Sequence, residues 1–167
     1  DAPERAAKSK MRSINIGVLL GLDKWRKEAF LTGLHAKYLQ DKFPDTEISI
    51  SVPRVRPYGE AESFKPEYAV SDKNIVQIIT AMRLFMPRLG ITISTREGAS
   101  LRENLIPLGI TRMSAGSVTS VGGHTIRAEK EECPGQFDIC DKRSVPDVKQ
   151  AIRNKGYQPV LKDWMPI

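Results

Sequence analysis

Short apolar runs alternate with longer amphipathic stretches along most of the chain. Residues 14–20 (INIGVLL) form an apolar run bounded by polar residues and Gly21. This pattern is typical of a strand that is buried on both faces, as the strands of parallel sheets are. Similar short runs predict strands at residues 47–52, 91–94 and 111–115.

The segment after the first predicted strand has helical periodicity. We expect Asp23 to be the N-cap of a helix that ends near Phe43 and Pro44. Two adjacent rows of residues spaced four apart mark its predicted face: Phe30, Leu34 and Tyr38, beside Leu31, His35 and Leu39.

Two further helices are expected between the later strands. Ser71 should open the first of them and Pro87 should stop it. Its apolar face consists of Ile75, Ile78, Ile79 and Met82. Ser100 and Glu103 have the spacing of a capping box, which predicts a short helix through Leu108.

The order of these elements predicts the α/β class. Strands that alternate with helices form parallel sheets with right-handed connections. Beyond Gly116 the pattern changes to a loop rich in Gly and Glu. Ser144 and Pro146 should open a last helix that Gly156 ends, and residues 158–161 should form a short strand. Residues 1–13 are interpreted as a polar arm or linker.

The amino-acid composition indicates which kinds of partner the chain is not expected to bind. Lys and Arg outnumber Asp and Glu by 26 to 20, which gives a net charge of +6. The basic residues are interleaved with acidic ones, whereas nucleic-acid binding needs a basic patch, so we expect no nucleic-acid partner. No apolar run is long enough to span a bilayer, so we expect no membrane association. The first residues lack the pattern of a signal peptide, and we expect a cytoplasmic protein.

The unusual residues follow the predicted strands. Gly17 and Gly21 enclose the end of the first strand, Arg54 and Arg56 follow the second, and Arg96 follows the third. Ligands of α/β sheets bind at the carboxyl ends of the strands, where these residues should meet. Arginine holds carboxylates and phosphates with two parallel hydrogen bonds. The sequence therefore predicts an anion-binding rim, and the carboxylate of an amino acid or a nucleotide suits it.

Each of these features also has a structural explanation. The segment GVLLG, residues 17–21, can be a tightly packed strand without a ligand. Arg54 and Arg56 can pair with surface carboxylates, and Arg96 can pair with the adjacent Glu97. We interpret His35 as a structural helix residue rather than a catalytic one.

Six segments, taken in order, resemble the C-terminal half of the radical S-adenosylmethionine tyrosine lyase of thiazole biosynthesis, the 2-iminoacetate synthase family. They are GVLLGL, HAKYLQDKF, SISVPRVRP, VSDKNIVQIITAMRLFMP, ISTREGASLRENLIPLGITRMSAGS and GYQPVLKDW. The resemblance covers residues 14–164 and implies a partial (β/α) barrel of about four parallel units at residues 14–117. Residues 118–167 would be a C-terminal extension of the biotin and thiamin synthesis associated region.

The resemblance also implies roles for individual residues. Gly17, Val18, Leu19 and Gly21 resemble the strand that lines the adenosine of S-adenosylmethionine. Arg96 resembles the residue that binds the carboxylate of tyrosine, assisted by Ser94 and Ser114. Arg54 and Arg56 match the PRxRP pattern of the family and would lie near substrate or cosubstrate. The reaction implied is cleavage of tyrosine between Cα and Cβ to 2-iminoacetate and 4-cresol.

Cysteines mark the departure from that family. Its CxxxCxxC loop, which binds the [4Fe-4S] cluster, is absent, and Cys133 and Cys140 have six residues between them. That is not the spacing of a common metal site, so we expect idle thiols and no metal in this chain. The cluster ligands would then lie in a missing N-terminal half-barrel, without which this chain would be inactive.

The resemblance implies further partners and leaves alternatives open. Thiazole synthase is the protein partner that it implies. A related hydrogenase maturase also cleaves tyrosine but carries clustered cysteines in its tail, whereas the tail here reads GYQPVLKDWMPI, which favours the thiamine branch. A non-catalytic half-barrel that binds a carboxylate or anionic partner is another alternative.

A half-barrel should leave one face of its sheet open. We expect inward-facing apolar residues there, at positions 14, 16, 18, 91 and 93, and self-association as a symmetric homodimer that buries them.

Overall fold

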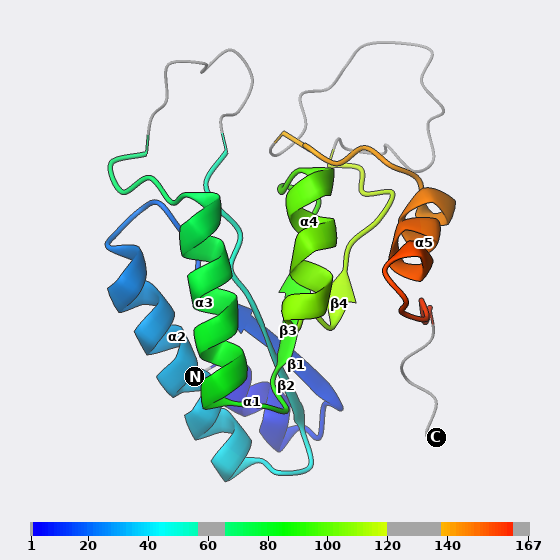
Figure 1. The fold of residues 1–167 in the computed structure, drawn as a ribbon. Helices are drawn as coiled ribbons and strands as arrows, with labels where there is room; N and C mark the ends of the chain where they lie inside the picture. The colour runs from blue at the N-terminus through cyan, green and yellow to red at the C-terminus, as the bar shows by residue number, and fades with distance from the viewer. Residues whose placement is uncertain (1, 57–65, 120–137, 162–167) are drawn as a thin grey trace.

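The alternation of strands and helices is confirmed. The computed structural model describes residues 2–56, 66–119 and 138–161 (Figure 1). The elements are α1 (Ala2–Lys8), β1 (Ser13–Gly17), α2 (Trp25–Lys42), β2 (Glu47–Ser51), α3 (Asp72–Phe85), β3 (Gly90–Ile93), α4 (Ala99–Leu105), the 3₁₀ helix η1 (Ile106–Leu108), β4 (Arg112–Met113) and α5 (Val145–Asn154).

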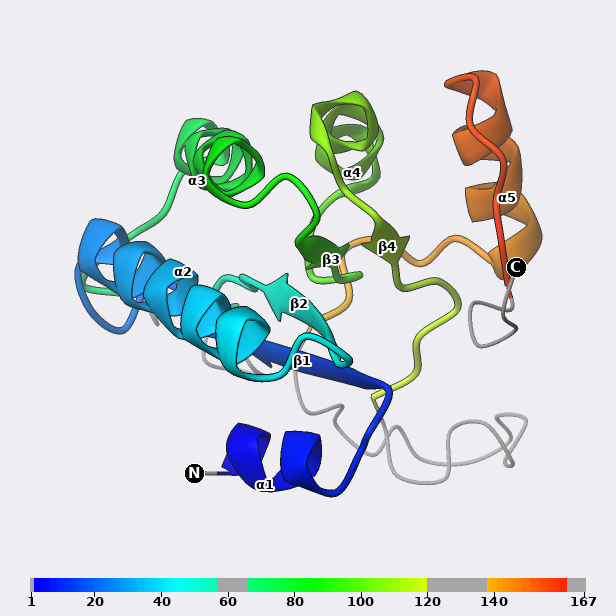
Figure 2. The ribbon, with the colours of Figure 1, turned by 90° about the horizontal axis from the view of Figure 1, so that it is seen from below.

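The strands form one parallel sheet in the order β1-β2-β3-β4. Ser13 pairs with Glu47, Ser49 with Gly90 and Ile93 with Met113. Helices α2, α3 and α4 lie on one face, and α1 lies on the opposite side, near β1 (Figure 2). In the described part of the chain the sheet is open, with β1 and β4 as its edges. The α/β class is thus confirmed, while a closed barrel is not seen.

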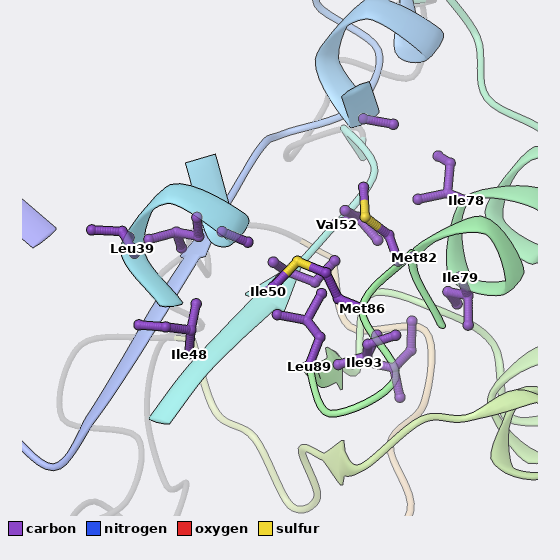
Figure 3. Close-up of a cluster of buried hydrophobic side chains, with 14 of the residues drawn as sticks. Leu39, Ile48, Ile50, Val52, Ile78, Ile79, Met82, Met86, Leu89 and Ile93 are labelled. Atoms are coloured by element: carbon purple, nitrogen blue, oxygen red, sulfur yellow. The ribbon is translucent and has the colours of Figure 1, made fainter. Parts of the chain in front are cut away.

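The hydrophobic core lies between the sheet and the helices. Ile78, Ile79 and Met82 of α3 project toward the strands, where Ile50 and Ile93 are also buried (Figure 3). The face of α3 predicted from its periodicity is therefore the buried one. Burial of each such side chain contributes about 1.5–3 kcal/mol, so this layer is the main source of stability.

The expected direction of the strand isoleucines is wrong. Ile14, Ile16, Ile91 and Ile93 are at most 8% exposed and belong to the core on the helix side. Val18 packs partly buried against the same core. Because side chains alternate along a strand, the opposite face carries the intervening polar residues and glycines. The apolar open face on which we based the homodimer is absent from the described residues, and the homodimer stays a prediction without that support.

That open face is polar. Asn15 Nδ2 donates to Ser51 Oγ at 3.0 Å, and Ser49 Oγ donates to Asn15 Oδ1 at 3.0 Å. At the amino ends of the strands, Arg112 donates to Ser13 Oγ at 3.3 Å and to Glu47 Oε2 at 3.1 Å. The face of the sheet opposite α2, α3 and α4 is thus lined by hydrogen-bonding groups.

The buried face of α2 also differs from the prediction. Its buried residues are Ala29, Thr32, Gly33, Ala36 and Leu39. Of the predicted rows only Leu39 is buried; the others, Phe30, Leu31, Leu34, His35 and Tyr38, are exposed. Small residues let the helix approach α3 closely: a Cβ at Gly33 would lie 3.2 Å from the Met82 sulfur. Close packing, rather than side-chain size, decides which face is buried.

Two of the four predicted helix starts are confirmed. Ser71 and Ser144 are N-caps, each in a capping box with the residue three positions later. Lys24, not Asp23, caps α2, and the Asp23 carboxylate accepts a hydrogen bond from the Lys24 amide at 2.6 Å. Gly98, not Ser100, precedes α4.

The two ends of the described chain differ from expectation. Residues 1–13, expected as a polar arm, contain α1, in which Ala7 is buried. Glu4 anchors this helix to α2, because its carboxylate accepts from Tyr38 Oη at 2.6 Å and from Lys42 Nζ at 3.1 Å. Residues 158–161 form no strand.

None of the helices in the described ranges has the length and apolar character needed to cross a membrane.

Candidate functional site

The carboxyl ends of β1 and β2 are joined by backbone hydrogen bonds beyond the strands themselves. The Leu20 amide donates to the Pro53 carbonyl at 2.8 Å, and the Val55 amide donates to the Leu20 carbonyl at 2.8 Å. Residues 52–56, which contain both arginines of the PRxRP pattern, are therefore held beside the end of β1. The predicted convergence of strand ends is present here.

Glu97 lies at the centre of this rim and is fully buried. The Nε atom of Arg54 donates to its two carboxylate oxygens, each at 3.1 Å, and Arg54 Nη2 donates to Oε2. Arg56 Nη2 donates to Oε2 at 3.0 Å. Residues 52–56 and the turn after β3 are thus locked together by charge-assisted bonds.

Arg54 has further partners at the edge of the rim. It reaches the Val70 carbonyl at 2.9 Å and the exposed Asp72 carboxylate at 2.8 Å. Burial alone would lower the pKa of Arg54, but the bonds to Glu97 and Asp72 outweigh it, and the pKa is raised. The predicted pairing of Arg54 and Arg56 with carboxylates is present, although their common partner, Glu97, is buried rather than on the surface.

Arg96 occupies the same turn and is half-buried. Its Nη1 atom donates to the Arg54 carbonyl at 3.5 Å, and its amide donates to Ser94 Oγ at 3.2 Å. Burial lowers the pKa of Arg96, yet an arginine remains a cation at neutral pH. The side chain therefore carries its charge into the rim.

Ser94 and Ser114 follow β3 and β4 in register, since Ile93 pairs with Met113. The Ser114 amide donates to the Ile93 carbonyl at 3.1 Å. Both serines are half-buried. The structure thus brings Arg96, Ser94 and Ser114 to adjacent strand ends.

The backbone requires glycine at positions 17 and 21. A Cβ at Gly17 would lie 2.1 Å from the Ser51 carbonyl oxygen, and Gly21 has a φ of +114°. The tight-packing explanation of GVLLG therefore accounts for both glycines. Between them, Val18 is half-buried and Leu19 is 37% exposed.

Sequence reasoning missed a second cluster of charges. Arg102 of α4 is fully buried; it forms an ion pair with Asp141 and donates to the Ser114 carbonyl. Arg143 donates to Asp141 from Nε at 2.9 Å and from Nη2 at 2.8 Å. Arg143 also contacts Glu103 at 2.5 Å. The stretch CDKRS around Asp141 is an ordinary loop sequence, and its partner in α4 lies 39 residues away, so no local pattern could reveal the cluster.

This cluster ties a late segment of the chain to the rim. The amides of Cys140 and Asp141 both donate to the Thr95 carbonyl, at 3.0 and 3.1 Å. Hydrogen bonds from Arg143, opposed by burial and reinforced by Arg102, lower the pKa of Asp141 to about 2. Residues 140–143 thereby also help to fix the turn that bears Arg96.

The described residues contain no group of three or more His, Cys, Asp or Glu side chains that could hold a metal ion. Cys140 is exposed and is not part of a disulfide. Cys133 lies outside the described residues.

Comparison with known sequences identifies a family. The family model described as "Biotin and Thiamin Synthesis associated domain" matches residues 51–158. The 2-iminoacetate synthase of Escherichia coli strain K12 is 34% identical over 165 residues, which cover 98% of this chain and 42% of that protein. The 2-iminoacetate synthase of Salmonella typhimurium strain LT2 matches with the same figures. The chain thus spans less than half the length of these relatives.

Solved structures agree with this result. HydG, a maturase of the [FeFe]-hydrogenase, superimposes with a TM-score of 0.82 at 35% identity, over 96% of this chain and 34% of HydG. HydG from Carboxydothermus hydrogenoformans gives a TM-score of 0.76 at 33% identity, over 93% of this chain and 34% of that one. The predicted resemblance is confirmed, and the chain belongs to the Biotin and Thiamin Synthesis associated domain family.

Proposed function

We propose that this chain is the C-terminal part of a radical S-adenosylmethionine enzyme that cleaves tyrosine between Cα and Cβ, giving 2-iminoacetate and 4-cresol. Similarity to 2-iminoacetate synthases over 98% of the chain supports this reaction. The observation that carries the proposal is that Ser94 and Arg96, which follow β3, and Ser114, which follows β4, lie at the ends of neighbouring parallel strands. A cation and hydroxyl groups on adjacent strand ends suit the carboxylate of an amino acid.

In this proposal Arg96 binds the tyrosine carboxylate with two parallel hydrogen bonds, and Ser94 and Ser114 complete the contact. Such a clamp fixes the amino acid and converts the encounter of the reacting groups into an oriented, effectively unimolecular step. Arg54 and Arg56 lie beside the clamp, where their contacts with Glu97 give them a supporting role next to the substrate.

The radical chemistry would be supplied by S-adenosylmethionine together with a [4Fe-4S] cluster. This chain does not fit the cluster, because such clusters are held by several cysteine thiolates and the sequence has only Cys133 and Cys140. We therefore place the cluster ligands in an N-terminal half-barrel outside this chain. For S-adenosylmethionine, the exposed Leu19 and the bare backbone of Gly17 would give the adenosine a flat, partly apolar surface beside Val18 and Gly21.

We further propose that the four βα units close into a barrel with that N-terminal half. The polar open face of the sheet, with Asn15, Ser49 and Ser51, would then line the barrel interior. A cytoplasmic enzyme of the thiamine branch, with thiazole synthase as protein partner, is the setting that we propose. The likeness to HydG makes a hydrogenase-maturase type of tyrosine lyase the second candidate.

The reaction can be tested on the complete polypeptide that contains this chain. It would be reconstituted anaerobically with iron and sulfide, then supplied with S-adenosylmethionine, a reductant and tyrosine. We expect 4-cresol as the product, and we expect this chain alone to remain colourless and inactive. Tyrosine that is bound but never consumed by the reconstituted protein would instead identify a non-catalytic carboxylate-binding module.

A further inference from the structure

One buried carboxylate serves two arginines at the rim. Glu97 is fully buried, and it accepts hydrogen bonds from Arg54 and Arg56, both of which belong to the segment after β2. Glu97 itself lies in the turn after β3. It is therefore the charged link between two neighbouring strand ends.

In the same turn, the side chain of Arg96 lies in a more exposed position than that of Glu97. Along residues 94–97 the buried side chains are Thr95 and Glu97, whereas Ser94 and Arg96 are half-buried. The Glu97 amide donates to the Ser94 carbonyl at 3.3 Å, and the Arg96 amide donates to Ser94 Oγ at 3.2 Å. A compact turn thus places the Glu97 carboxylate in the interior and leaves the Arg96 guanidinium in the rim.

The backbone of Arg54 provides one support for Arg96. The Arg96 guanidinium donates to the backbone carbonyl of Arg54 at 3.5 Å, and the Arg54 side chain is fixed by its two-pronged contact with Glu97. Loss of that contact would remove the side-chain link between residues 52–56 and the turn after β3, and with it a support of the contact between Arg96 and the Arg54 carbonyl. Three cations would then lie together without an internal carboxylate, and like charges repel strongly where water is excluded.

From these contacts we infer that Glu97 is a positioning residue for substrate binding. It engages Arg54 and Arg56 inside the protein, holds the two strand ends at a fixed spacing, and so makes Arg96 the cation that meets the substrate carboxylate. This inference rests on the proposed function for the identity of the substrate. The geometric part of it, the dependence of Arg96 on Glu97, does not.

The test uses the complete polypeptide with Glu97→Gln, which keeps the size of the side chain and removes its charge. We expect the dissociation constant for tyrosine, measured by calorimetry, to rise at least about tenfold, the equivalent of about 1.4 kcal/mol. The rate at saturating tyrosine should change less than about twofold, since the residue does not touch the reacting atoms. Glu97→Asp keeps the charge and should restore part of the affinity.

Asp72→Asn is the matched control. It removes the exposed carboxylate partner of the same Arg54 and should leave tyrosine affinity within about twofold of wild type, because exposed ion pairs contribute little. If Glu97→Gln does not fold, Arg54→Lys provides the second variant, because it retains the charge and loses the two-pronged contact. Wild-type affinity in the folded Glu97→Gln protein, or in Arg54→Lys, overturns the inference.

A crystal structure of the Glu97→Gln protein separates this inference from the proposed function. We expect the Arg96 guanidinium to leave the Arg54 carbonyl in the variant. If the wild-type protein binds no tyrosine, the proposed function fails, and this structural comparison still decides the positioning role. An Arg96 side chain that remains in place in the variant contradicts that role.

Discussion

Replacing Asp141 removes the carboxylate that joins residues 140–143 to α4. Asp141 is buried between Arg102 and Arg143, and its pKa falls from an ordinary 3.8 to about 2. At about 1.4 kcal/mol for each pH unit, this difference stabilises the folded chain at neutral pH by about 2 kcal/mol. Asp141→Asn should lose about that amount. Asp141→Ala should lose about 3–5 kcal/mol, because Arg102 is then left buried without its carboxylate.

Urea unfolding followed by circular dichroism measures these differences at pH 7. Asp41→Asn is the control, since it breaks an exposed pair with Lys37 and should cost less than about 1 kcal/mol. The pH dependence supplies a second check. A carboxyl whose folded pKa is lowered stabilises the protein fully above its unfolded pKa, so the advantage over Asp141→Asn should be constant above about pH 5. It should disappear as the pH falls from about 4 to about 2. Asp141→Asn with a stability within about 0.5 kcal/mol of wild type at pH 7 would refute this reasoning.

Two further predictions concern the scaffold. Gly17→Ala should destabilise the chain by about 1–3 kcal/mol, because the added methyl group would overlap the Ser51 carbonyl. Urea unfolding measures this loss, and an unchanged unfolding midpoint would show that β1 and β2 can move apart at no cost in stability. Ser71→Ala should lower the stability by about 1 kcal/mol because it removes the N-cap of α3. Ser100→Ala should be nearly neutral, because the residue before α4 is Gly98. Equal effects of the two substitutions on thermal unfolding would contradict these cap assignments.

Local patterns in the sequence predict much of this fold. The capping boxes at Ser71 and Ser144 and the apolar face of α3 depend on residues three or four apart, and the structure has them as expected. The prediction that the first strand is buried on both faces is wrong, because INIG is not uniformly apolar: Asn15 and Gly17 alternate with two isoleucines. That alternation turns the isoleucines toward the helices and leaves the open face polar.

Contacts between distant residues set the limit of prediction. The large side chains of α2 predict the wrong buried face for this helix. The buried face contains Gly33 because Met82 of α3 packs closely against it, and the sequence of α2 alone does not show that contact. In the site, strand order alone predicts that Arg54, Arg56 and Arg96 converge. The sequence does not predict which of these arginines pairs with Glu97. Arg54 and Glu97 are 43 residues apart, and no local pattern in a single sequence reveals such a contact.

The central claim is that Arg96 binds the carboxylate of the substrate, and a comparison of tyrosine with tyramine tests it most directly, because tyramine lacks only that group. Calorimetry on the complete polypeptide should show a clear preference of the wild-type protein for tyrosine, and Arg96→Ala should remove it at a cost of about 2–5 kcal/mol in tyrosine binding. Arg88→Ala, at the amino end of β3, is the control and should keep the preference. Equal binding of tyrosine and tyramine by Arg96→Ala is the predicted result. A variant that still prefers tyrosine as strongly as the wild type would contradict the account.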